Sequence, residues 1–509
     1  MGLFEHLISL FSIRKVNTFH VIYFSLAAVV VYLVLSVVWN LFFHPLRRFP
    51  GPLLARASTI WYRIAGFQAN KAHWIHAAHS RYGPVIRVAP NELSFADPAA
   101  VRQVYTSKEF VKAETFYRAK TIYHENHVFS IRNIEDHHSR RRLLNKGFSL
   151  AALTDFESSL SIKIRTLLDQ WAMRTRENPT IEVYPWLYYL SFDTIYHLLF
   201  GVDPECVKTG QSHEVMQYMT AWRMTYIYKE LIPSLERWGI FMPATVGDTF
   251  RKVRKWKFYA MEVVRSARMK DAKTPFLQNV LHGEDSSFGR PLNDSELAEE
   301  CMGAMFGGTG TTANSFIYLL WATLQIPEVV KSLQQELRMK FPDRKTVPDF
   351  LACSKLPYVQ AVISETLRLY PTIIGTQPRT ATEDALVCGV VVPKGTTVGI
   401  QNYTIHRNAD AFPDPESFRP SRWLETNSEA SLNKMREVFV PFSVGRHACL
   451  GKTLAEFELT VLVAAFFLRF DATVDPTMLH GGMKMEDRFS AAPIGRSLVL
   501  RMQERLVEE

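Results

Sequence analysis

The pattern of apolar and polar residues separates an apolar amino-terminal segment from a long mixed body. Residues 21–43, VIYFSLAAVVVYLVLSVVWNLFF, carry no formal charge, and Asn40 is the one strongly polar residue among them. At about 1.5 Å rise per residue, a helix of this length can cross a hydrocarbon core of about 30 Å. A cleaved signal peptide is the alternative, but its apolar region is about 7 to 15 residues long and ends in small residues. We therefore expect an uncleaved membrane anchor.

A proline-rich segment, HPLRRFPGP (residues 44–52), follows the anchor. Pro45, Pro50 and Pro52 prevent a continuous helix, and Arg47 and Arg48 suit the level of the lipid headgroups. After residue 52 no Gly/Ser-rich linker, acidic block or repeat divides the chain. We expect residues 1–52 to form the anchor and hinge, and residues 53–509 to form one catalytic domain.

The body has the pattern of many long helices and a few short strands. One helix is predicted to begin after Asn293, whose side chain can cap it together with Glu296 in a capping box, and to end near Pro327. Its middle contains glycines, each of which costs about 1 kcal/mol relative to Ala in a helix interior: Gly303, Gly307, Gly308 and Gly310. Two interpretations stay open, namely close helix packing, or a loosened helix against which a flat group lies. In the second, hydroxyls come from Thr309, Thr311 and Thr312.

A pair of opposite charges stands in an apolar segment, SETLRLYP. Glu365 and Arg368 are three residues apart, and therefore share a helix face. On a surface such a pair is worth less than about 1 kcal/mol, but apolar neighbours require the two charges to be buried together or neutralised. The later segment FRPSRW offers Arg422 as a third member, although an ordinary proline-containing loop remains an alternative.

The cysteines are odd in number, scattered and without a CxxC pair, which argues against a disulfide framework and a zinc site: Cys206, Cys301, Cys353, Cys388 and Cys449. Cys449 alone has unusual neighbours, because it lies between Gly445 and Gly451 where a helix begins. Helix starts favour the thiolate. A nucleophile would need a base and an acyl-transfer motif, which the loop lacks. A lone thiolate can instead be the axial ligand of heme iron, with the glycines letting the backbone approach the ring.

Together these segments resemble the cytochrome P450 family of heme-thiolate monooxygenases. FSVGRHACLG is similar to its FxxGxRxCxG heme loop, ETLR to its ExxR motif, FRPSRW to its PxRW-like element and GGTGTT to its [AG]GxxTT helix. The resemblance covers nearly the whole chain and implies the cytochrome P450 fold, mainly α with small β-sheets, behind an amino-terminal transmembrane helix. The hinge resembles that of membrane-bound fungal members. It implies a single-pass protein of the endoplasmic reticulum membrane with a cytosolic catalytic domain.

The resemblance also implies roles for individual residues. Cys449 becomes the iron ligand of heme b, and Glu365, Arg368 and Arg422 form a structural triad behind the heme. Thr311 takes the position of the oxygen-activating threonine. The same motifs add heme-loop and helix positions: Phe442, Gly445, Gly451, Gly308 and Thr312.

Propionate partners are implied by two further segments. HHSRRRLLNKGFS resembles a helix whose His and Arg, four residues apart, hold the heme propionates, which selects His138 and Arg142. A basic solvated helix face stays open as the alternative. QPRT offers Arg379 as another propionate partner.

Two positions depart from the family pattern. His447 stands where the family has an arginine, and Arg446 comes one place earlier. His447 can still donate to a propionate, but its charge would depend on pH because an unperturbed histidine titrates near ~6.5. Gly310 replaces the acidic residue before the threonine, so that protons would come through Thr311, Thr309, water or a substrate hydroxyl.

The implied reaction is oxidation of a hydrophobic small molecule by O2, with hydroxylation of a secondary-metabolite intermediate as the leading expectation. Because no GxGxxG motif stands on a βαβ unit, the electrons should come from a separate NADPH-cytochrome P450 reductase. By family position, the substrate cavity should draw on residues 116–129, Met302, Met305, Phe306, Ile373, Ile374 and residues 489–494.

Three alternatives to this function are an atypical family member, a noncatalytic heme-binding protein and a nucleic-acid-binding protein. An atypical member would catalyse desaturation, ring expansion or isomerisation, and a noncatalytic heme-binding membrane protein would show no turnover. The charge excess, 59 − 50 = 9, suits an acidic protein, an anionic bilayer or nucleic acid. Nothing else in the sequence favours nucleic acid.

Overall fold

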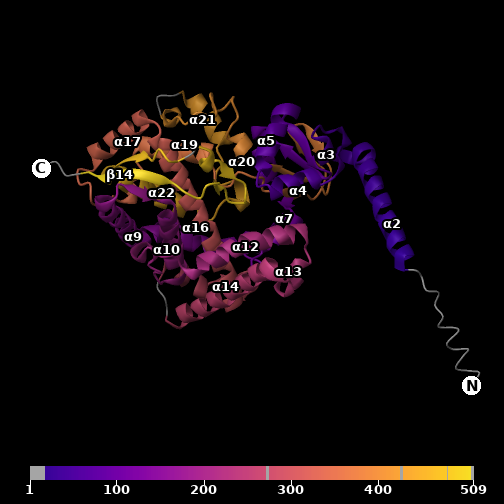
Figure 1. Ribbon diagram of the computed structural model, residues 1–509, viewed down its shortest axis with the longest axis horizontal. Coiled ribbons are helices and arrows are strands. Elements are labelled where there is room, and N and C mark those ends of the chain that lie inside the picture. The colour runs from indigo at the N-terminus through magenta and orange to yellow at the C-terminus, as the bar shows by residue number, and fades with distance from the viewer. Residues whose placement is uncertain (1–17, 271–273, 425–427, 479, 506–509) are drawn as a thin grey trace, which may run out of the picture.

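The computed structural model describes residues 18–270, 274–424, 428–478 and 480–505, and long helices make up most of its body (Figure 1). The long helices are α9 (Leu150–Glu177), α10 (Tyr184–Phe200), α12 (Glu214–Leu231), α14 (Ala244–Met269), α16 (Asp294–Leu324), α17 (Pro327–Lys340), α19 (Pro357–Leu369) and α22 (Lys452–Arg469). Shorter helices are α3 (Leu53–Ala57), α4 (Ile60–Phe67), α5 (Lys71–Tyr82), α6 (Pro98–Tyr105), α7 (Glu114–Ala119), α8 (Ile134–Asn145), α11 (Cys206–Thr209), α13 (Leu235–Trp238), α15 (Pro275–His282), α18 (Phe350–Cys353), α20 (Asn402–Ile405) and α21 (Glu429–Val438).

The strands form small sheets. The largest has the order β1 (Val85–Ala89), β2 (Glu92–Phe95), β10 (Thr397–Ile400), β7 (Arg379–Ala381) and β3 (Phe110–Lys112). In it β2 pairs parallel with β10, and β10 pairs antiparallel with β7. A three-stranded sheet contains β11 (Phe470–Val474), β14 (Val499–Glu504) and β4 (Thr180–Glu182). Two-stranded pairs are β5 (Glu284–Asp285) with β6 (Arg290–Pro291), β8 (Ala385–Val387) with β9 (Val390–Val392), and β12 (Met485–Glu486) with β13 (Ala492–Pro493). The predicted class, mainly α with small sheets, is confirmed.

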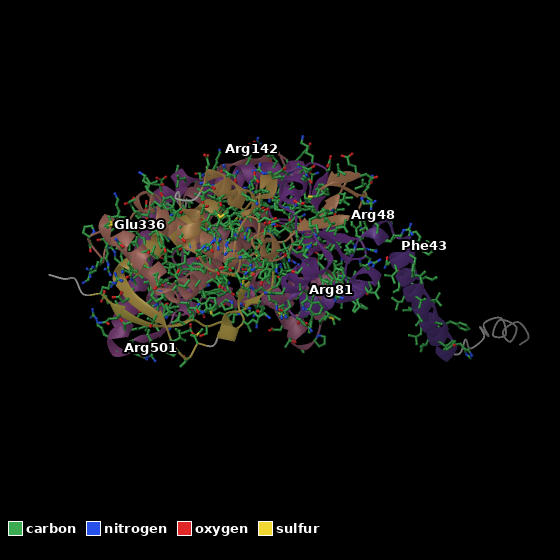
Figure 2. All side chains as sticks on the ribbon, turned by 90° about the horizontal axis from the view of Figure 1, so that it is seen from above. Phe43, Arg48, Arg81, Arg142, Glu336 and Arg501 are labelled. Carbon is green, nitrogen blue, oxygen red and sulfur yellow. The ribbon has the colours of Figure 1, made fainter. Side chains whose placement is uncertain are left out.

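The amino-terminal helix α2 (Thr18–Val38) extends away from the body (Figures 1 and 2). The helical segment His20–Phe43 is 24 residues long, has a mean hydropathy of 2.6 and has length and composition enough to cross a membrane. Asn40 donates from Nδ2 to the Ala57 carbonyl at 2.9 Å, and its own carbonyl accepts from Arg87 at 2.8 Å. The polar residue of the apolar segment therefore ties the end of the segment to the body.

Helix α16 runs through the centre of the body and packs against α10, α14, α19 and α22 (Figure 1). Its capping box forms as predicted, because Asn293 accepts from the Glu296 backbone and Glu296 accepts from the Asn293 backbone. The helix is continuous through its glycines. Of the two open interpretations, the loosened helix is therefore not observed. Leucine, isoleucine and phenylalanine side chains of α9, α10, α16 and α22 fill one buried core, and a second core lies under the five-stranded sheet.

Candidate active site

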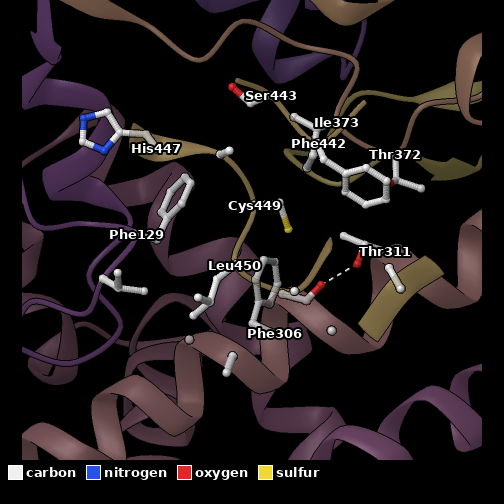
Figure 3. A pocket seen from close by; sticks show the side chains of 18 of the residues that line it. Phe129, Phe306, Thr311, Thr372, Ile373, Phe442, Ser443, His447, Cys449 and Leu450 are labelled. Carbon is white, nitrogen blue, oxygen red and sulfur yellow. Dashed lines mark hydrogen bonds between the residues drawn. The ribbon is translucent and has the colours of Figure 1, made fainter. Parts of the chain in front are cut away.

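A cavity separates the middle of α16 from the loop that precedes α22. Figure 3 shows the Cys449 sulfur pointing into it, with Thr311 and Phe306 of α16 across the space. Most of the lining is apolar. It includes Ile122, Val128, Phe129, Ile195, Trp222, Phe306, Ile373, Phe442, Leu450 and Phe489.

The cysteine loop is held by backbone contacts on both sides of Cys449. The Cys449 backbone donates to the Phe442 carbonyl at 2.8 Å, and Arg141 donates to the Ala448 carbonyl at 2.5 Å. Gly445 has φ +73°, and a Cβ there would lie 2.6 Å from the Tyr105 carbonyl oxygen. Gly445 is thus required for the turn and for contact with α6, rather than for approach to a ring as expected. Gly451 does line the cavity, and a Cβ there would meet nothing within 4 Å.

The pKa of the Cys449 thiol is raised by burial, which outweighs the backbone N–H of Gly451 and the Arg141 guanidinium. The expected effect of the helix start is present, because the Gly451 N–H and Arg141 lower the pKa, but burial raises it by more. Cysteine sulfur becomes a metal ligand as thiolate, and a bound cation deprotonates it. Within the cavity, metal binding is what would generate the thiolate.

The predicted triad is present beside the cavity. Arg368 donates to both oxygens of Glu365 at 2.9 and 2.8 Å, and Arg422 donates to one of them at 3.0 Å. Trp423 Nε1 and the Arg419 backbone add further donors, each at 2.9 Å. Glu365 and Arg368 have 0% exposed side chains, and neither residue lines the cavity, whereas Leu367 between them does. The triad therefore supports the cavity wall without entering it.

Helix α8 presents a different pair from the one expected. His138 and Arg142 are exposed, and Arg142 donates to Ser286 at 2.7 Å on the outer surface (Figure 2). His137 and Arg141 line the cavity, together with Leu144 one turn further on. Two His–Arg pairs four residues apart are possible in this segment, because the histidines are adjacent and so are the arginines. The packing of α8 turns the pair His137 and Arg141 towards the cavity. The prediction of His138 and Arg142 as cavity residues is wrong.

His447 faces the cavity and meets His137. Their Nδ1 and Nε2 atoms are 3.2 Å apart, and the rings cross at 69°. Burial, followed by the charge of Lys112, lowers the pKa of His447 far below its usual value, and burial lowers that of His137 to about 3. Within the protein alone, both pKa shifts favour the neutral rings, whereas the sequence predicts a charge on His447 that depends on pH. Arg446 points elsewhere and donates to the Thr106 carbonyl at 3.3 Å.

Two further cations lie near this part of the cavity, of which Lys112 lines it, whereas Arg379 does not line it and lies behind the lining residue Tyr117. Arg379 in β7 is 1% exposed and donates to the Tyr117 hydroxyl at 2.5 Å, while its Nη2 is buried without a partner among the described residues. Lys112 lines the cavity, and its Nζ donates to the carbonyls of Val128 and Phe129 at 3.0 and 2.7 Å. Sequence reasoning missed Lys112. The sequence pattern that could have indicated it is that Lys112 lies two residues after Phe110, and therefore on the same buried face of the strand.

These residues fit an anionic, flat cofactor. A buried guanidinium nitrogen of Arg379 lacks an acceptor, and burial lowers the pKa of Lys112 well below its usual value, which an adjacent carboxylate would offset. The sulfur of Cys449 and the open side of Gly451 leave room for a ring between them and α16. The cations lie at one edge of that space.

One face of α16 forms the opposite wall of the cavity. Gly308, Thr311 and Thr312 line it as expected. The Thr311 hydroxyl donates to the Gly307 carbonyl at 2.5 Å, whereas Thr309 donates to the Met305 carbonyl and does not line the cavity. Met302, Met305 and Ile374 are buried core residues outside the lining. Helix periodicity turns Met302 and Met305 away from the cavity, whereas Ile374 lies in the loop between α19 and β7. Of residues 489–494, Phe489 alone lines the cavity.

Gly310 lies on another side of α16. A Cβ there would be 2.9 Å from Nη2 of Arg223 and 3.7 Å from the hydroxyl oxygen of Tyr188. The place where the family pattern has an acid is thus next to a guanidinium of α12 and a phenol of α10. Asn314, one turn further along, donates to the same Tyr188 hydroxyl at 2.9 Å.

Comparison with known proteins matches the family model described as Cytochrome P450 to residues 49–490. This chain belongs to the cytochrome P450 family. A cytochrome P450 monooxygenase of Talaromyces stipitatus, tpeC, is 30% identical to this P450 over 465 residues, which cover 89% of each chain. The monooxygenase tazI of Aspergillus terreus is 29% identical over 449 residues, covering 86% of this chain and 89% of its own. An averantin hydroxylase of Dothistroma septosporum is 28% identical over 466 residues, covering 89% of this chain and 85% of its own.

Membership of the family establishes the broad chemistry of this P450. It is an oxidoreductase that incorporates oxygen, its cofactor is heme b, and it needs O2, a redox partner and a substrate. The noncatalytic alternative is thereby set aside. In the structure, Cys449 is the cysteine whose sulfur faces the cavity that fits this cofactor.

Proposed function

We propose that this P450 hydroxylates a hydrophobic small molecule, an intermediate of fungal secondary metabolism. The balanced reaction is RH + O2 + NADPH + H⁺ → ROH + H2O + NADP⁺. The observation that carries the proposal is the Cys449 sulfur facing α16 across a cavity with apolar walls. The fungal relatives named as monooxygenases, and one named as a hydroxylase, support the substrate class.

The bound heme would supply activation of O2, with Cys449 as its iron ligand. Lys112, Arg141, His137 and His447 line the cavity and would hold its anionic edge. Arg379 lies behind Tyr117, which lines the cavity, and would add its unpaired Nη2. The Thr311 hydroxyl donates its hydrogen bond to the Gly307 carbonyl, which leaves its oxygen lone pairs free to accept a hydrogen bond in the cavity. Thr311 would therefore hold a water in place, and the proton would come from that water.

The electron donor in this proposal is NADPH-cytochrome P450 reductase. Lys452, three residues after Cys449, has an exposed side chain and would attract an acidic partner. The same proposal places residues 1–52 as membrane anchor and hinge, and residues 53–509 as the catalytic domain on the cytosolic side of the endoplasmic reticulum. The exposed apolar surface of α2 supports an anchor.

The test is the difference spectrum of the reduced protein with carbon monoxide. We expect the Soret shift characteristic of thiolate ligation in the wild-type protein, and its loss in Cys449→Ser. Cys388→Ser is the matched control, because Cys388 is a partly exposed cysteine outside the cavity. A wild-type protein without the shift, or a Cys449→Ser variant that keeps it, would overturn the assignment. Product analysis with NADPH and reductase then tests hydroxylation.

Gly310 favours one alternative within the family. Because this position carries no carboxylate and faces Arg223, the second candidate is an isomerisation, which needs no delivered protons. A desaturation or an oxidative ring expansion consumes O2 and NADPH as hydroxylation does, so product analysis distinguishes these reactions. Hydroxylation consumes one NADPH and one O2 per product. An isomerisation consumes neither, so measured stoichiometry separates the two.

A further inference from the structure

The part of the cavity over α16 has aromatic walls. Phe306 and Phe489 lie nearly parallel with ring centroids 6.0 Å apart, Phe129 meets Phe489 edge-on at 5.5 Å, and Trp222 meets Phe306 at 4.3 Å. Aromatic rings arranged in this way favour a flat apolar ligand. His127 is a polar side chain in the same wall, with 5% of its surface exposed.

The hydrogen bonding of His127 fixes its tautomer. Its Nε2 lies 3.2 Å from the Lys120 carbonyl oxygen. Because a carbonyl can only accept, Nε2 carries the hydrogen and donates it. Burial lowers the pKa of His127, so the ring is neutral near pH 7 and Nδ1 keeps a free lone pair. No described residue donates a hydrogen bond to that Nδ1.

The space beside Nδ1 is kept open by a glycine. A Cβ at Gly303 of α16 would lie 2.9 Å from Nδ1 of His127, and both residues line the cavity. Any larger side chain at this position would displace the ring or cover its acceptor. His127 lines the cavity, so a ligand that brings a donor to Nδ1 gains a hydrogen bond worth about 0.5–1.5 kcal/mol.

We propose that His127 determines substrate specificity, with its Nδ1 accepting a hydrogen bond from a hydroxyl on a planar aromatic substrate that packs against the wall formed by Phe306, Phe489 and Phe129. The inference deepens the proposed function and rests on it for the reaction. His127 positions the substrate. A substrate that carries a phenol is thus distinguished from its ether or from the bare hydrocarbon, because those lack the donor.

Binding of 2-naphthol and 2-methoxynaphthalene to the full-length holoenzyme in detergent, measured by calorimetry, tests this. The two probes share the aromatic body, and only naphthol has a donor. We expect the wild-type protein to bind naphthol more tightly by roughly five- to tenfold. In His127→Phe the two affinities should become equal through weaker naphthol binding, while methoxynaphthalene binding stays within about twofold.

Gly303→Ala provides a second route that keeps the imidazole. Its Cβ would lie against Nδ1, so the preference for naphthol should also disappear. His127→Asn, whose side chain has an acceptor oxygen, should recover part of the preference. Equal affinities in the wild-type protein, or an unchanged preference in either His127→Phe or Gly303→Ala, would overturn the proposal. The carbon monoxide spectrum reports thiolate ligation separately, so failure of the reaction and failure of this recognition are distinguishable.

Discussion

The two walls of the cavity are built on opposite principles. Behind the cysteine loop, Glu365 receives donors from Arg368, Arg422, Trp423 and the Arg419 backbone, so its buried charge is fully paired. On the α16 side, the Thr311 hydroxyl bonds its own helix, and Gly307 leaves open space. The wall on the cysteine side holds the cysteine loop in one position, whereas the α16 wall leaves space for the substrate and water.

The difference follows from the cost of buried charge. Removing one partner from a buried pair leaves the other unpaired, at a cost of about 3–5 kcal/mol, so the cysteine-side wall tolerates little change. The α16 wall contains hydroxyls and glycines, whose substitution changes chemistry before it changes folding. The predictions below test this contrast.

The largest effect should follow Arg368→Ala. Glu365 would then be buried with two of its donors removed, and the free energy of unfolding should fall by about 3–5 kcal/mol. Chemical denaturation of the solubilised protein measures this. Arg436→Ala on the exposed face of α21 is the control, with a change within about 0.5 kcal/mol. Equal stability of the two variants would contradict a structural triad.

A large effect on chemistry without loss of folding is expected from Thr311→Ala. The variant should consume NADPH but give at least about tenfold less product per NADPH, because no hydroxyl positions water in the cavity. Product and NADPH are quantified together with a substrate identified by product analysis. Thr309→Ala should remain coupled, since its hydroxyl bonds the Met305 carbonyl outside the cavity. Coupled turnover by Thr311→Ala would contradict the role of its hydroxyl in positioning water.

A smaller effect is expected from His447→Ala. Loss of the ring removes a cavity donor and leaves His137 Nε2 without its neighbour, which should weaken heme binding by roughly tenfold. Heme per protein after purification and dilution gives the measurement. His447→Arg should retain heme because arginine also donates, and exposed His138→Ala should behave as wild type. Undiminished heme in His447→Ala would argue against its role.

The smallest effect should come from Gly310→Asp. The new carboxylate would reach Arg223, whose Nη2 is 2.9 Å from the position of a Cβ. Gly310 is buried and Arg223 is partly exposed, so desolvation of the new carboxylate offsets most of the attraction, and the net gain from the pair should be about 0–1 kcal/mol. Replacing a helical glycine adds a few tenths of a kcal/mol. Thermal unfolding in the Arg223 and Arg223→Ala backgrounds isolates the pair. If the gain is the same in both backgrounds, Arg223 is not the partner.

Much of the fold and the site could be predicted from local sequence. The Asn293 and Glu296 cap required only helix chemistry, and the Glu365–Arg368 pair required only spacing and apolar neighbours. Cys449 stood out through its glycines, although Gly445 serves contact with Tyr105 instead of the cavity. These features depend on residues a few positions apart.

Other features required the packed structure. His137 and His138 are adjacent, and the rotation of α8 against the cavity decided which one faces inward. Lys112, Arg379 and His447 come from distant segments that meet only when β3, β7 and the cysteine loop pack together. The spacing of residues along the sequence does not predict these contacts between distant segments.

The sequence alone therefore determined the apolar amino-terminal helix, the long capped helix, the buried ion pair and the cysteine, because each follows from short-range physical chemistry. The tertiary structure alone decided that Arg223 lies beside Gly310 and that His127 lies over Gly303. Both contacts join segments far apart in the chain, and their geometry depends on how whole helices and loops pack.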